Sequence, residues 1–315
     1  MDGDFEVEDI YQMLELLSRA SNGPAAQEAS ADALGWLGGV LHGVYERLEF
    51  AAHLRNSNTE AGSARNIAYH YDAGNDFYKL FLDGTMLYSS GRHETLCGDY
   101  AAKAAALDAM SFEEQEAELT RAQLAKMDAM ISRAQLQPGE HVLEIGCGWG
   151  EMAIRMAREA GVRVTGLTIS REQLAEARRR VAAASLDHMI SIEFCDYRKV
   201  EGVFDKVVSI EMIEAVGHEH LPVFFATVSR ALKPGGLAAI QVITLPDERY
   251  DAYCKEHSDF IRTYIFPGGH LPSLGAMVSF ASRAALSIDG LADIGIDYAV
   301  TLRLWRARLM GGAAQ

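Results

Sequence analysis

The stretch HVLEIGCGWGE, residues 141–151, joins a short apolar run to three glycines at alternate positions, and a helical pattern follows at once. This order predicts a strand, a tight turn and the start of a helix. Glycine suits such a turn because it adopts positive φ and lets a ligand approach the backbone N–H groups at the helix N-terminus. The stretch therefore indicates a ligand-binding turn, with a plain strand-to-helix connection as the alternative.

The second predicted strand, 163–168, bears on the class of ligand. It ends in Thr168 and carries no acidic residue, whereas a dinucleotide-binding unit places Asp or Glu there to bind a ribose hydroxyl. The glycines are also spaced G-x-G-x-G, and no G-K-[ST] follows them. Nicotinamide dinucleotides are therefore disfavoured, and a phosphate-binding P-loop is excluded.

Strand-like and helix-like segments alternate through the second half of the chain. Strands are predicted at 141–145, 163–168, 189–195, 204–210 and 236–243, with helices at about 150–160, 171–184 and 219–232. Apolar strands separated by helices predict an α/β fold with a doubly wound, mostly parallel sheet. Ligands of such sheets bind beyond the carboxyl ends of the strands, so the strand exits form the candidate site: 146–150, 168–173, 195–197, 210–214 and 241–244.

The first 135 residues differ in composition from this alternating region. Apolar residues recur at helical spacing in 1–60, which predicts an acidic helical region that packs on the main domain, with a partner-docking arm as the alternative. The stretch 66–93 is rich in Tyr, Phe, Asp and Gly, which favours a pocket wall over a cover for the domain edge. A helix is predicted over 113–135. We expect three regions: a helical region 1–60, a cap segment with its lead-in helix 61–135, and a ligand-binding core 136–315.

Composition excludes several classes of function. A chain of 315 residues that is 49% hydrophobic can bury a large core. A net charge of −15 argues against nucleic acid as a partner and requires any membrane contact to be local and apolar. The four cysteines are far apart without C-x-x-C, which predicts reduced thiols in the cytoplasm. The segment Gly217-His218-Glu219-His220 offers two imidazoles, but its place at a helix start favours a structural role over a metal site.

Seven segments follow one another in an order that belongs to a known family: NIAYHYDAGNDFYKLFLDGTMLYSS (66–90), VLEIGCGWG (142–150), GLTISREQ (166–173), CDYR (195–198), IEMIEAVG (210–217), YIFPGGHLPS (264–273) and DYAVTLRLWRARL (297–309). Together they resemble the cyclopropane-fatty-acid-phospholipid synthase and mycolic acid cyclopropane synthase family of class I methyltransferases. The first and sixth segments are far more specific than the glycine turn. The resemblance covers about residues 65–309.

The resemblance implies that S-adenosylmethionine binds at the strand exits. Gly146 and Gly148 would offer bare backbone to its amino-acid end, and Thr168 and Gln173 would meet its ribose as neutral groups. The adenine would lie between Asp196 and Tyr197, and the cap segment would close over the cofactor. The implied cofactor-binding residues are Tyr88, Ser89, Gly146, Gly148, Thr168, Gln173, Asp196, Tyr197 and Ile210.

The chemistry implied by the resemblance is transfer of a methyl or methylene group to a double bond of an unsaturated acyl chain of phospholipid. An alkene needs no deprotonation to act as a nucleophile, so no Ser–His or Cys–His pair is required. The carbocation that follows would be stabilised by aromatic faces, at about 0.5–2 kcal/mol per contact, with Tyr264, Phe266 and Tyr88 as candidates. A base must then take a proton.

In the family that base is a bicarbonate ion held by a Cys, a Glu, a His, an Ile backbone group and a late Tyr. Ser90 and Gln241 stand where the Cys and the His would be, and both can still hydrogen-bond an anion. We expect no counterpart of the late Tyr, because the chain stops soon after the W-x-x-R-L segment. Bicarbonate use is therefore uncertain, and a cyclopropane, a methyl branch and a methylene product all stay open. The implied catalytic residues are Glu214, Ser90, Gln241, Ile243 and Tyr264.

The resemblance also sets expectations for partners and for the edge of the sheet. A sixth strand is expected at 286–294, and the family's last strand, which lies between the fifth and sixth, is expected to be missing. A second copy or another subunit would supply it, so we expect a homo- or hetero-oligomer in the cytoplasm, in peripheral contact with the inner face of the membrane. Two other functions remain open: a methyltransferase of a soluble small molecule, and a weakly catalytic subunit of a hetero-oligomeric lipid methyltransferase.

Overall fold

The computed structural model describes residues 62, 74–255, 261–266 and 268–312. The chain divides into two compact units, Met1–Ala52 and His53–Gln315, and all described residues belong to the second. The helical region expected at 1–60 therefore lies outside the described residues. Among the helices of the described part, none is long and apolar enough to cross a membrane.

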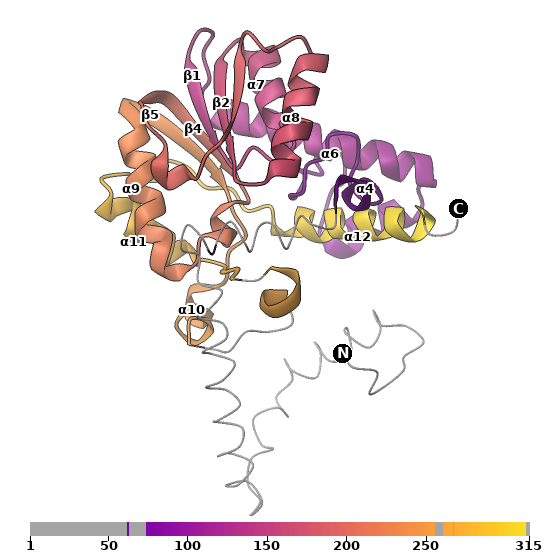
Figure 1. Cartoon of the computed structure of the whole chain (residues 1–315). Helices are drawn as coiled ribbons and strands as arrows, with labels where there is room; N and C mark the ends of the chain where they lie inside the picture. Colours follow the sequence, from indigo (N-terminus) through magenta and orange to yellow (C-terminus); the bar gives the residue numbers. More distant parts are fainter. Residues whose placement is uncertain (1–61, 63–73, 256–260, 267, 313–315) are drawn as a thin grey trace, which may run out of the picture. The chain divides into compact units, whose positions relative to one another are not determined.

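A five-stranded parallel sheet forms the centre of this unit (Figure 1). Its strands lie in the order β3-β2-β1-β4-β5, and every neighbouring pair is parallel. The chain winds outward from β1 in one direction and then from β4 in the other, which creates a switch point where ligands bind in such sheets. The predicted doubly wound sheet is confirmed. Its strands are β1 (His141–Ile145), β2 (Arg163–Thr168), β3 (Ile190–Phe194), β4 (Phe204–Ile210) and β5 (Leu232–Gln241).

Helices cover both faces of the sheet, which is why its central strands are rich in buried apolar residues. On one face α6 (Phe112–Arg133), α7 (Glu151–Ala160) and α8 (Arg171–Ala183) enclose an apolar cluster that includes Met127, Met156 and Val164. On the other face α9 (Leu221–Ala231) and α11 (Leu274–Arg283) enclose a second cluster, which includes Leu143 and Phe224. The predicted helices on both faces are confirmed to within a few residues.

A third apolar cluster joins the cap segment to the end of the chain. Tyr78, Phe81 and Leu82 pack with Trp149 of the glycine turn and with Trp305 of α12. Four of its eleven buried members are aromatic, and aromatic rings bury a large area per side chain. The remaining helices are α4 (Gly74–Lys79), α5 (Tyr100–Asp108), α10 (Asp247–Tyr253) and α12 (Gly295–Gly312), with short turns at Tyr197–Lys199 (η2), Ile213–Ala215 (η3), His218–His220 (η4) and Ile261–Ile265 (η5).

Two local devices fix the position of α6, the long helix between the cap and the sheet. A capping box starts it, because the Ser111 side chain accepts from the Glu114 N–H and the Glu114 side chain accepts from the Ser111 N–H. Farther along the helix, buried Glu118 contacts His93 Nδ1 at 2.9 Å, and His93 Nε2 lies 3.0 Å from Thr301 Oγ1 of α12. This buried network ties α6 to α12 through the cap segment.

The strand predicted at 286–294 is wrong. That segment has no regular structure, and the side chains of Ile288 and Leu291 are 46% and 67% exposed. A strand is stable only when its backbone groups pair with a neighbour. Within the described ranges, β5 is the edge of the sheet and no strand lies on its outer side. The segment has alternating apolar residues but no ladder to join.

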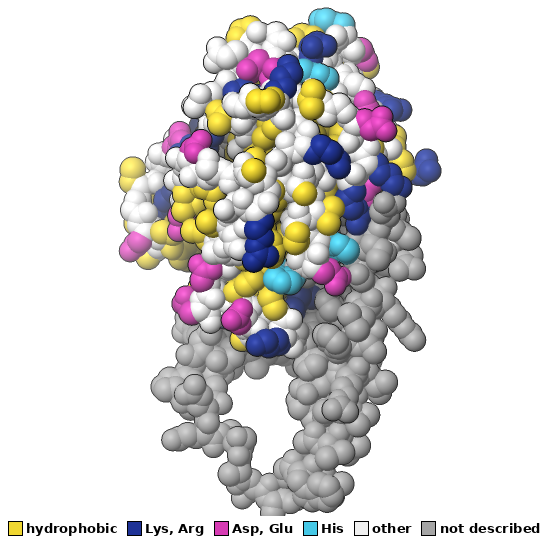
Figure 2. All heavy atoms as spheres, turned by 90° about the vertical axis from the view of Figure 1, so that its left-hand side faces the viewer, with side chains coloured by type: hydrophobic (Ala, Val, Ile, Leu, Met, Phe, Trp, Pro, Cys, Tyr) yellow, Lys and Arg dark blue, Asp and Glu magenta, His cyan; other side chains and the backbone are white. Residues whose placement is uncertain are grey.

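The surface over α9 and α11 carries mixed charges. Figure 2 shows basic and acidic side chains interspersed with hydrophobic ones on the face that it turns to the viewer. Nucleic-acid sites require basic side chains gathered into a patch or stripe. This face has no such patch among the described residues.

Candidate active site

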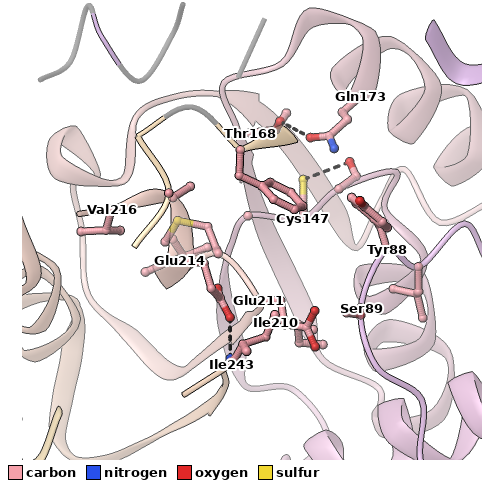
Figure 3. A pocket seen from close by; sticks show the side chains of 18 of the residues that line it. Tyr88, Ser89, Cys147, Thr168, Gln173, Ile210, Glu211, Glu214, Val216 and Ile243 are labelled. Atoms are coloured by element: carbon pink, nitrogen blue, oxygen red, sulfur yellow. Dashed lines mark hydrogen bonds between the residues drawn. The ribbon is translucent and has the colours of Figure 1, made fainter. Parts of the chain in front are cut away.

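A cavity of about 830 Å³ opens beyond the carboxyl ends of the central strands. This volume is within the range of about 300–1,000 Å³ that is typical of small-molecule sites. The glycine turn, the exits of β2, β3 and β4, part of the cap segment and α12 all contribute to its walls. Figure 3 shows Ser89 of the cap, Cys147 of the glycine turn and Ile210 at the exit of β4 around this space. The strand exits predicted to form the site therefore surround one space.

The glycine turn presents backbone to this cavity. Gly146 and Gly148 have φ values of 81° and 52°, a region that favours glycine. A Cβ on Gly146 would lie 2.7 Å from the Met212 side chain, so no larger residue fits without movement. A Cβ on Gly148 would meet no atom within 4 Å and would instead project into open space. The second glycine thus leaves room for a ligand against the backbone.

Thr168 and Gln173 meet at the start of α8. The Thr168 hydroxyl lies 2.9 Å from Gln173 Oε1 and also accepts from the Ser170 N–H at 3.1 Å (Figure 3). Ser170 caps α8 by accepting from the Gln173 N–H. Thr168 and Gln173 line the cavity. The predicted neutral hydrogen-bonding pair is therefore held in a fixed position.

Asp196 and Tyr197 form a second polar corner at the exit of β3. Asp196 accepts from Arg198 Nε at 2.8 Å and from the Arg198 N–H at 2.9 Å. Although burial raises the pKa of Asp196, these hydrogen bonds hold the pKa below its usual range. Burial raises the pKa of Tyr197 to about 12, and its ring packs edge-on against Phe224. This corner offers a fixed carboxylate beside a neutral aromatic ring.

The cap contributes Tyr88 and Ser89, which play different parts. Tyr88 belongs to an aromatic wall, with its ring centroid 5.4 Å from Trp305 and 6.3 Å from the stacked ring of Phe266. Ser89 is buried, and its hydroxyl accepts from Lys126 Nζ at 2.5 Å. Both residues line the cavity. The Ser89 hydroxyl therefore already has a partner within the protein.

Glu211 is the residue that sequence reasoning missed at the exit of β4. It is a non-glycine residue at φ 45°, an unusual backbone conformation that clusters at functional sites. Its Oε1 accepts from the Ser90 N–H at 2.9 Å and from Gln241 Nε2 at 2.9 Å. Burial raises the pKa of Glu211, and the charge of Lys126 opposes that rise. The signal for Glu211 was present in IEMIE, where an acid directly follows a buried strand.

The hydrogen bonds to Glu211 change the roles expected for Ser90 and Gln241. The Ser90 hydroxyl donates to the Gly91 carbonyl at 3.0 Å, so only the Ser90 backbone N–H is directed at an anion. Gln241 Nε2 donates to Glu211 and to the Ser90 carbonyl. A bicarbonate ion bound through these two residues does not fit, because their donors already serve a carboxylate of the chain itself.

Glu214 and Ile243 come together as predicted. Glu214 Oε1 accepts from the Ile243 N–H at 2.6 Å (Figure 3), and Oε2 is buried with no hydrogen-bond partner among the described residues. Burial and the negative charge of Glu211 raise the pKa of Glu214 to about 8. Glu214 is therefore mainly protonated at neutral pH. Since Oε1 accepts a hydrogen bond, the proton belongs on Oε2.

Lys126 of α6 is a second functional candidate that the sequence did not reveal. Its side chain is fully buried, and its charge interacts with those of Glu211 and Asp83. Burial lowers the pKa of Lys126 to about 8, while the two carboxylates oppose the shift. The sequence offered one signal: Lys126 stands next to Met127 and four residues from Ala122, within the buried face of the helix.

Tyr298 corrects the expectation that no late tyrosine reaches the site. It lies on α12 and lines the cavity. Burial raises the pKa of Tyr298 well above its usual range, and the charges of Glu211, Tyr88 and Glu214 add to the rise. The phenol therefore keeps its proton and can donate it in a hydrogen bond.

The remaining predicted residues are partly placed. Ile210 and Ile243 line the cavity. Tyr264 is in the turn Ile261–Ile265, but its side chain lies outside the described ones, so its role stays a prediction. Phe266, offered with it as an aromatic candidate, lines the cavity and stacks on Tyr88.

Comparison with known proteins gives a consistent result. A family model described as mycolic acid cyclopropane synthetase matches residues 58–315. Over 247 residues the chain is 44% identical to a tuberculostearic acid methyltransferase of Mycobacterium tuberculosis, a match that covers 78% of this chain and 55% of that protein. It is 34% identical over 241 residues to cyclopropane-fatty-acyl-phospholipid synthase of Escherichia coli, covering 76% and 55%. The chain thus spans about half the length of these relatives.

Solved structures agree with the sequence comparisons. The mycolic acid cyclopropane synthase CmaA1 complexed with SAH and CTAB is 31% identical, with a TM-score of 0.67 over 80% of this chain and 85% of that one. The cyclopropane synthase MmaA2 from Mycobacterium tuberculosis is 26% identical, with the same TM-score over 80% and 84%.

Proposed function

Because the chain belongs to the mycolic acid cyclopropane synthetase family, we propose that it is an S-adenosylmethionine-dependent C-methyltransferase acting on a double bond of an unsaturated acyl chain of phospholipid. One observation carries this proposal. A single cavity combines a glycine turn, an aromatic wall and a hydrogen-bonded carboxylate, Glu211.

The cofactor end of the cavity fits S-adenosylmethionine. The bare backbone at Gly148 leaves space for the amino-acid portion, and the Thr168–Gln173 pair offers neutral groups to a ribose. Asp196 and the neutral ring of Tyr197 suit a polar base that stacks. When bound, S-adenosylmethionine supplies an electrophilic methyl group. The residues of this chain would hold the cofactor at the carboxyl ends of the strands.

The other end of the cavity suits an acyl chain. Its lining includes Phe77, Phe81, Leu302 and Leu309, and the aromatic wall of Tyr88, Phe266 and Trp305 lies beside them. These rings present π-faces to a carbocation that forms when the double bond accepts a methyl group. The apolar lining favours a lipid over a soluble polar substrate, since the burial of apolar surface drives binding.

Glu211 is the proton acceptor in this proposal. The methylated double bond leaves an electron-deficient carbon, and loss of one proton to the Glu211 carboxylate gives either a cyclopropane or an unsaturated methylene product. Two N–H donors hold the carboxylate in place, and Lys126 favours its charged form. Glu214 is mainly protonated and offers a hydrogen-bond donor instead.

A saturated methyl branch does not balance with these residues alone. It requires a hydride in addition to the methyl group, and neither the side chains of the cavity nor S-adenosylmethionine supplies one. A methyl-branched product therefore requires a hydride donor from outside this chain, and a second protein that carries a reductant is one source. The family relationship to a tuberculostearic acid methyltransferase makes such a partner a specific alternative.

The test uses the full chain with S-adenosylmethionine carrying an isotopic label in its methyl group. Vesicles of an unsaturated phospholipid, vesicles of a saturated phospholipid and the free unsaturated acid are offered separately, and the lipids are analysed by mass spectrometry. We expect one labelled carbon in the unsaturated chain of the phospholipid only. Labelling of a soluble compound instead would refute the lipid assignment. Cofactor binding without transfer to any lipid would favour a weakly catalytic subunit.

A further inference from the structure

Three side chains of metal-binding type meet at the outer side of the cavity wall. They are His218 of η4, Cys254 at the end of α10, and His270 in the loop before α11. One ligand atom from each lies within 4.8 Å of the other two. His218 Nδ1 and Cys254 Sγ are 3.8 Å apart. Segments far apart in sequence thus bring two imidazoles and a thiol to one point.

The hydroxyl of Tyr250 lies between the two imidazole rings of this cluster. Its oxygen lies 2.7 Å from His218 Nδ1 and 2.9 Å from His270 Nε2, and it is hydrogen-bonded to Cys254. Four donor atoms therefore surround one small volume. In a tetrahedral zinc site with bonds of about 2.0–2.3 Å, neighbouring donors are about 3.3–3.8 Å apart. The two contacts of the Tyr250 oxygen are shorter than this range, so the hydroxyl must move away from the rings to admit an ion, whereas the separation of His218 and Cys254 is at its upper end.

A plain hydrogen-bonded network is the simpler interpretation of these contacts. A phenol and two histidines can satisfy one another without a metal ion, because the hydroxyl donates once and accepts from the second ring. The thiol is the feature that this interpretation leaves unexplained, since a cysteine is a weak hydrogen-bonding group. Two imidazoles with one thiolate are a donor set that suits Zn²⁺. Because Cys254 is exposed, an ion can reach it from solvent.

We propose that His218, Cys254 and His270 bind a Zn²⁺ ion, with the Tyr250 oxygen as the fourth donor. Binding converts the thiol to a thiolate and releases its proton to solvent, and both histidines coordinate as neutral imidazoles. The ion lies outside the methyl-transfer chemistry. It joins η4, α10 and the loop at His270, three separate segments of the chain.

The position of the site gives the ion a defined task. The His270 N–H donates to the Glu214 carbonyl oxygen at 2.8 Å, and His218 follows Glu214 on the same loop after β4. His270 and Tyr253, next to Cys254, also line the cavity. A bound ion therefore braces the wall that carries Glu214. It differs from the His218–His220 pair that the sequence suggested, because His270 comes from 50 residues farther along the chain.

The test uses the untagged full chain, stripped with a chelator and titrated with Co²⁺ as a spectroscopic substitute for Zn²⁺. We expect one equivalent of Co²⁺ to give the near-ultraviolet absorption of a thiolate-to-cobalt transition, which Zn²⁺ then abolishes by displacement. Cys254→Ser removes this band and weakens Zn²⁺ binding by at least about 100-fold, since loss of an outer hydrogen-bond partner alone costs about 10–100-fold. Cys97→Ser is the matched control, because Cys97 is also exposed and belongs to the cap segment.

Two further measurements make the result decisive. Zn²⁺ should raise the melting temperature of the wild-type chain and of Cys97→Ser, because a ligand that binds only the folded state stabilises it. His218→Gln should abolish that rise while circular dichroism of the variant shows a folded chain. The proposal is overturned if the wild-type chain binds well under one equivalent of metal, or if Cys254→Ser keeps the cobalt band. Neither result depends on methyl transfer, so the proposed function is tested separately.

Discussion

Replacement of Glu211 by Gln tests the proton acceptor directly. Both hydrogen bonds to Glu211 end on the same oxygen, Oε1. The amide oxygen of Gln can accept both, while its NH₂ group takes the place of Oε2. The variant therefore keeps the position of the side chain and loses its negative charge and its basicity.

The expected loss of kcat follows from the role of a positioned base. General acid–base catalysis contributes about 10²–10⁴-fold to a rate, so Glu211→Gln should lower kcat by that factor with little change in KM. Glu214→Gln is the matched control on the same loop. Glu214 is mainly protonated already, and an amide reproduces a neutral donor, so kcat should fall by less than about tenfold.

The assay is steady-state transfer of labelled methyl groups to unsaturated phospholipid vesicles, with binding of S-adenosylmethionine measured by calorimetry. Both variants should bind the cofactor as the wild type does. The reasoning is refuted if Glu211→Gln keeps kcat within about threefold of wild type while its cofactor binding is intact. A larger loss for Glu214→Gln than for Glu211→Gln would assign the base to Glu214.

Four further predictions follow from named contacts. Burial raises the pKa of Glu214 to about 8, whereas the unfolded value is near 4.3, so the folded chain holds a proton that the unfolded chain releases. The free energy of unfolding should therefore fall between about pH 4 and 8, by at most about 1.4 kcal/mol per pH unit from this group. Denaturant titrations should show a shallower fall for Glu214→Gln, and equal slopes would contradict the shift. Lys126→Met leaves Glu211 without its buried cation, so the free energy of unfolding should drop by about 3–5 kcal/mol. Because loss of that cation raises the pKa of Glu211, the acid limb of the pH–rate profile should also move to higher pH. An unchanged limb in folded protein would show that Lys126 does not act on Glu211. Gly148→Ala should weaken cofactor binding at least about tenfold. Gly139→Ala is the control and should not weaken it, because Gly139 is at a similarly open position with φ 86° in the turn before β1. Equal losses of cofactor binding in calorimetry would indicate backbone strain alone. Ser90→Ala should keep turnover within about threefold, because only the Ser90 N–H reaches Glu211; a large loss of kcat would return the anion-binding role to the hydroxyl.

The sequence predicted the central sheet well because β1, β2 and β4 are short runs rich in apolar residues and each is followed by a helix before the next strand. The turn at Gly146–Gly150 and the strand exits could be placed from pattern alone, since parallel strands bring their carboxyl ends to one edge. The fifth strand begins at Leu232, whereas the prediction started it at 236. The prediction missed the first residues because Pro234 and Gly235 are poor strand formers. The error at 286–294 arose because the sixth strand was expected from the family resemblance, whereas this segment has no neighbouring strand to pair with.

Side-chain partners were beyond the reach of sequence patterns. Lys126 and Ser89 are 37 positions apart in the chain, and only the packing of α6 against the cap brings them to 2.5 Å. Tyr298 was overlooked because the chain was expected to end before a tyrosine could return to the cavity. In both cases the missing information was a long-range contact.

The two departures from the expected anion site, Ser90 and Gln241, fit together with Glu211. Gln241 is a neutral donor where the family pattern has a ring that can carry charge, and Ser90 contributes a backbone N–H instead of a thiol. Either change alone would weaken a site for a free anion. Together they form two neutral donors at hydrogen-bonding distance from one carboxylate oxygen, and Glu211 supplies that oxygen from a backbone conformation that directs its side chain to them. Because a tethered carboxylate needs no binding from solution, it is present at a fixed position in every catalytic cycle. The proposed role of Glu211 as the base therefore explains Ser90, Gln241 and Glu211 together, and it predicts that turnover does not respond to added bicarbonate.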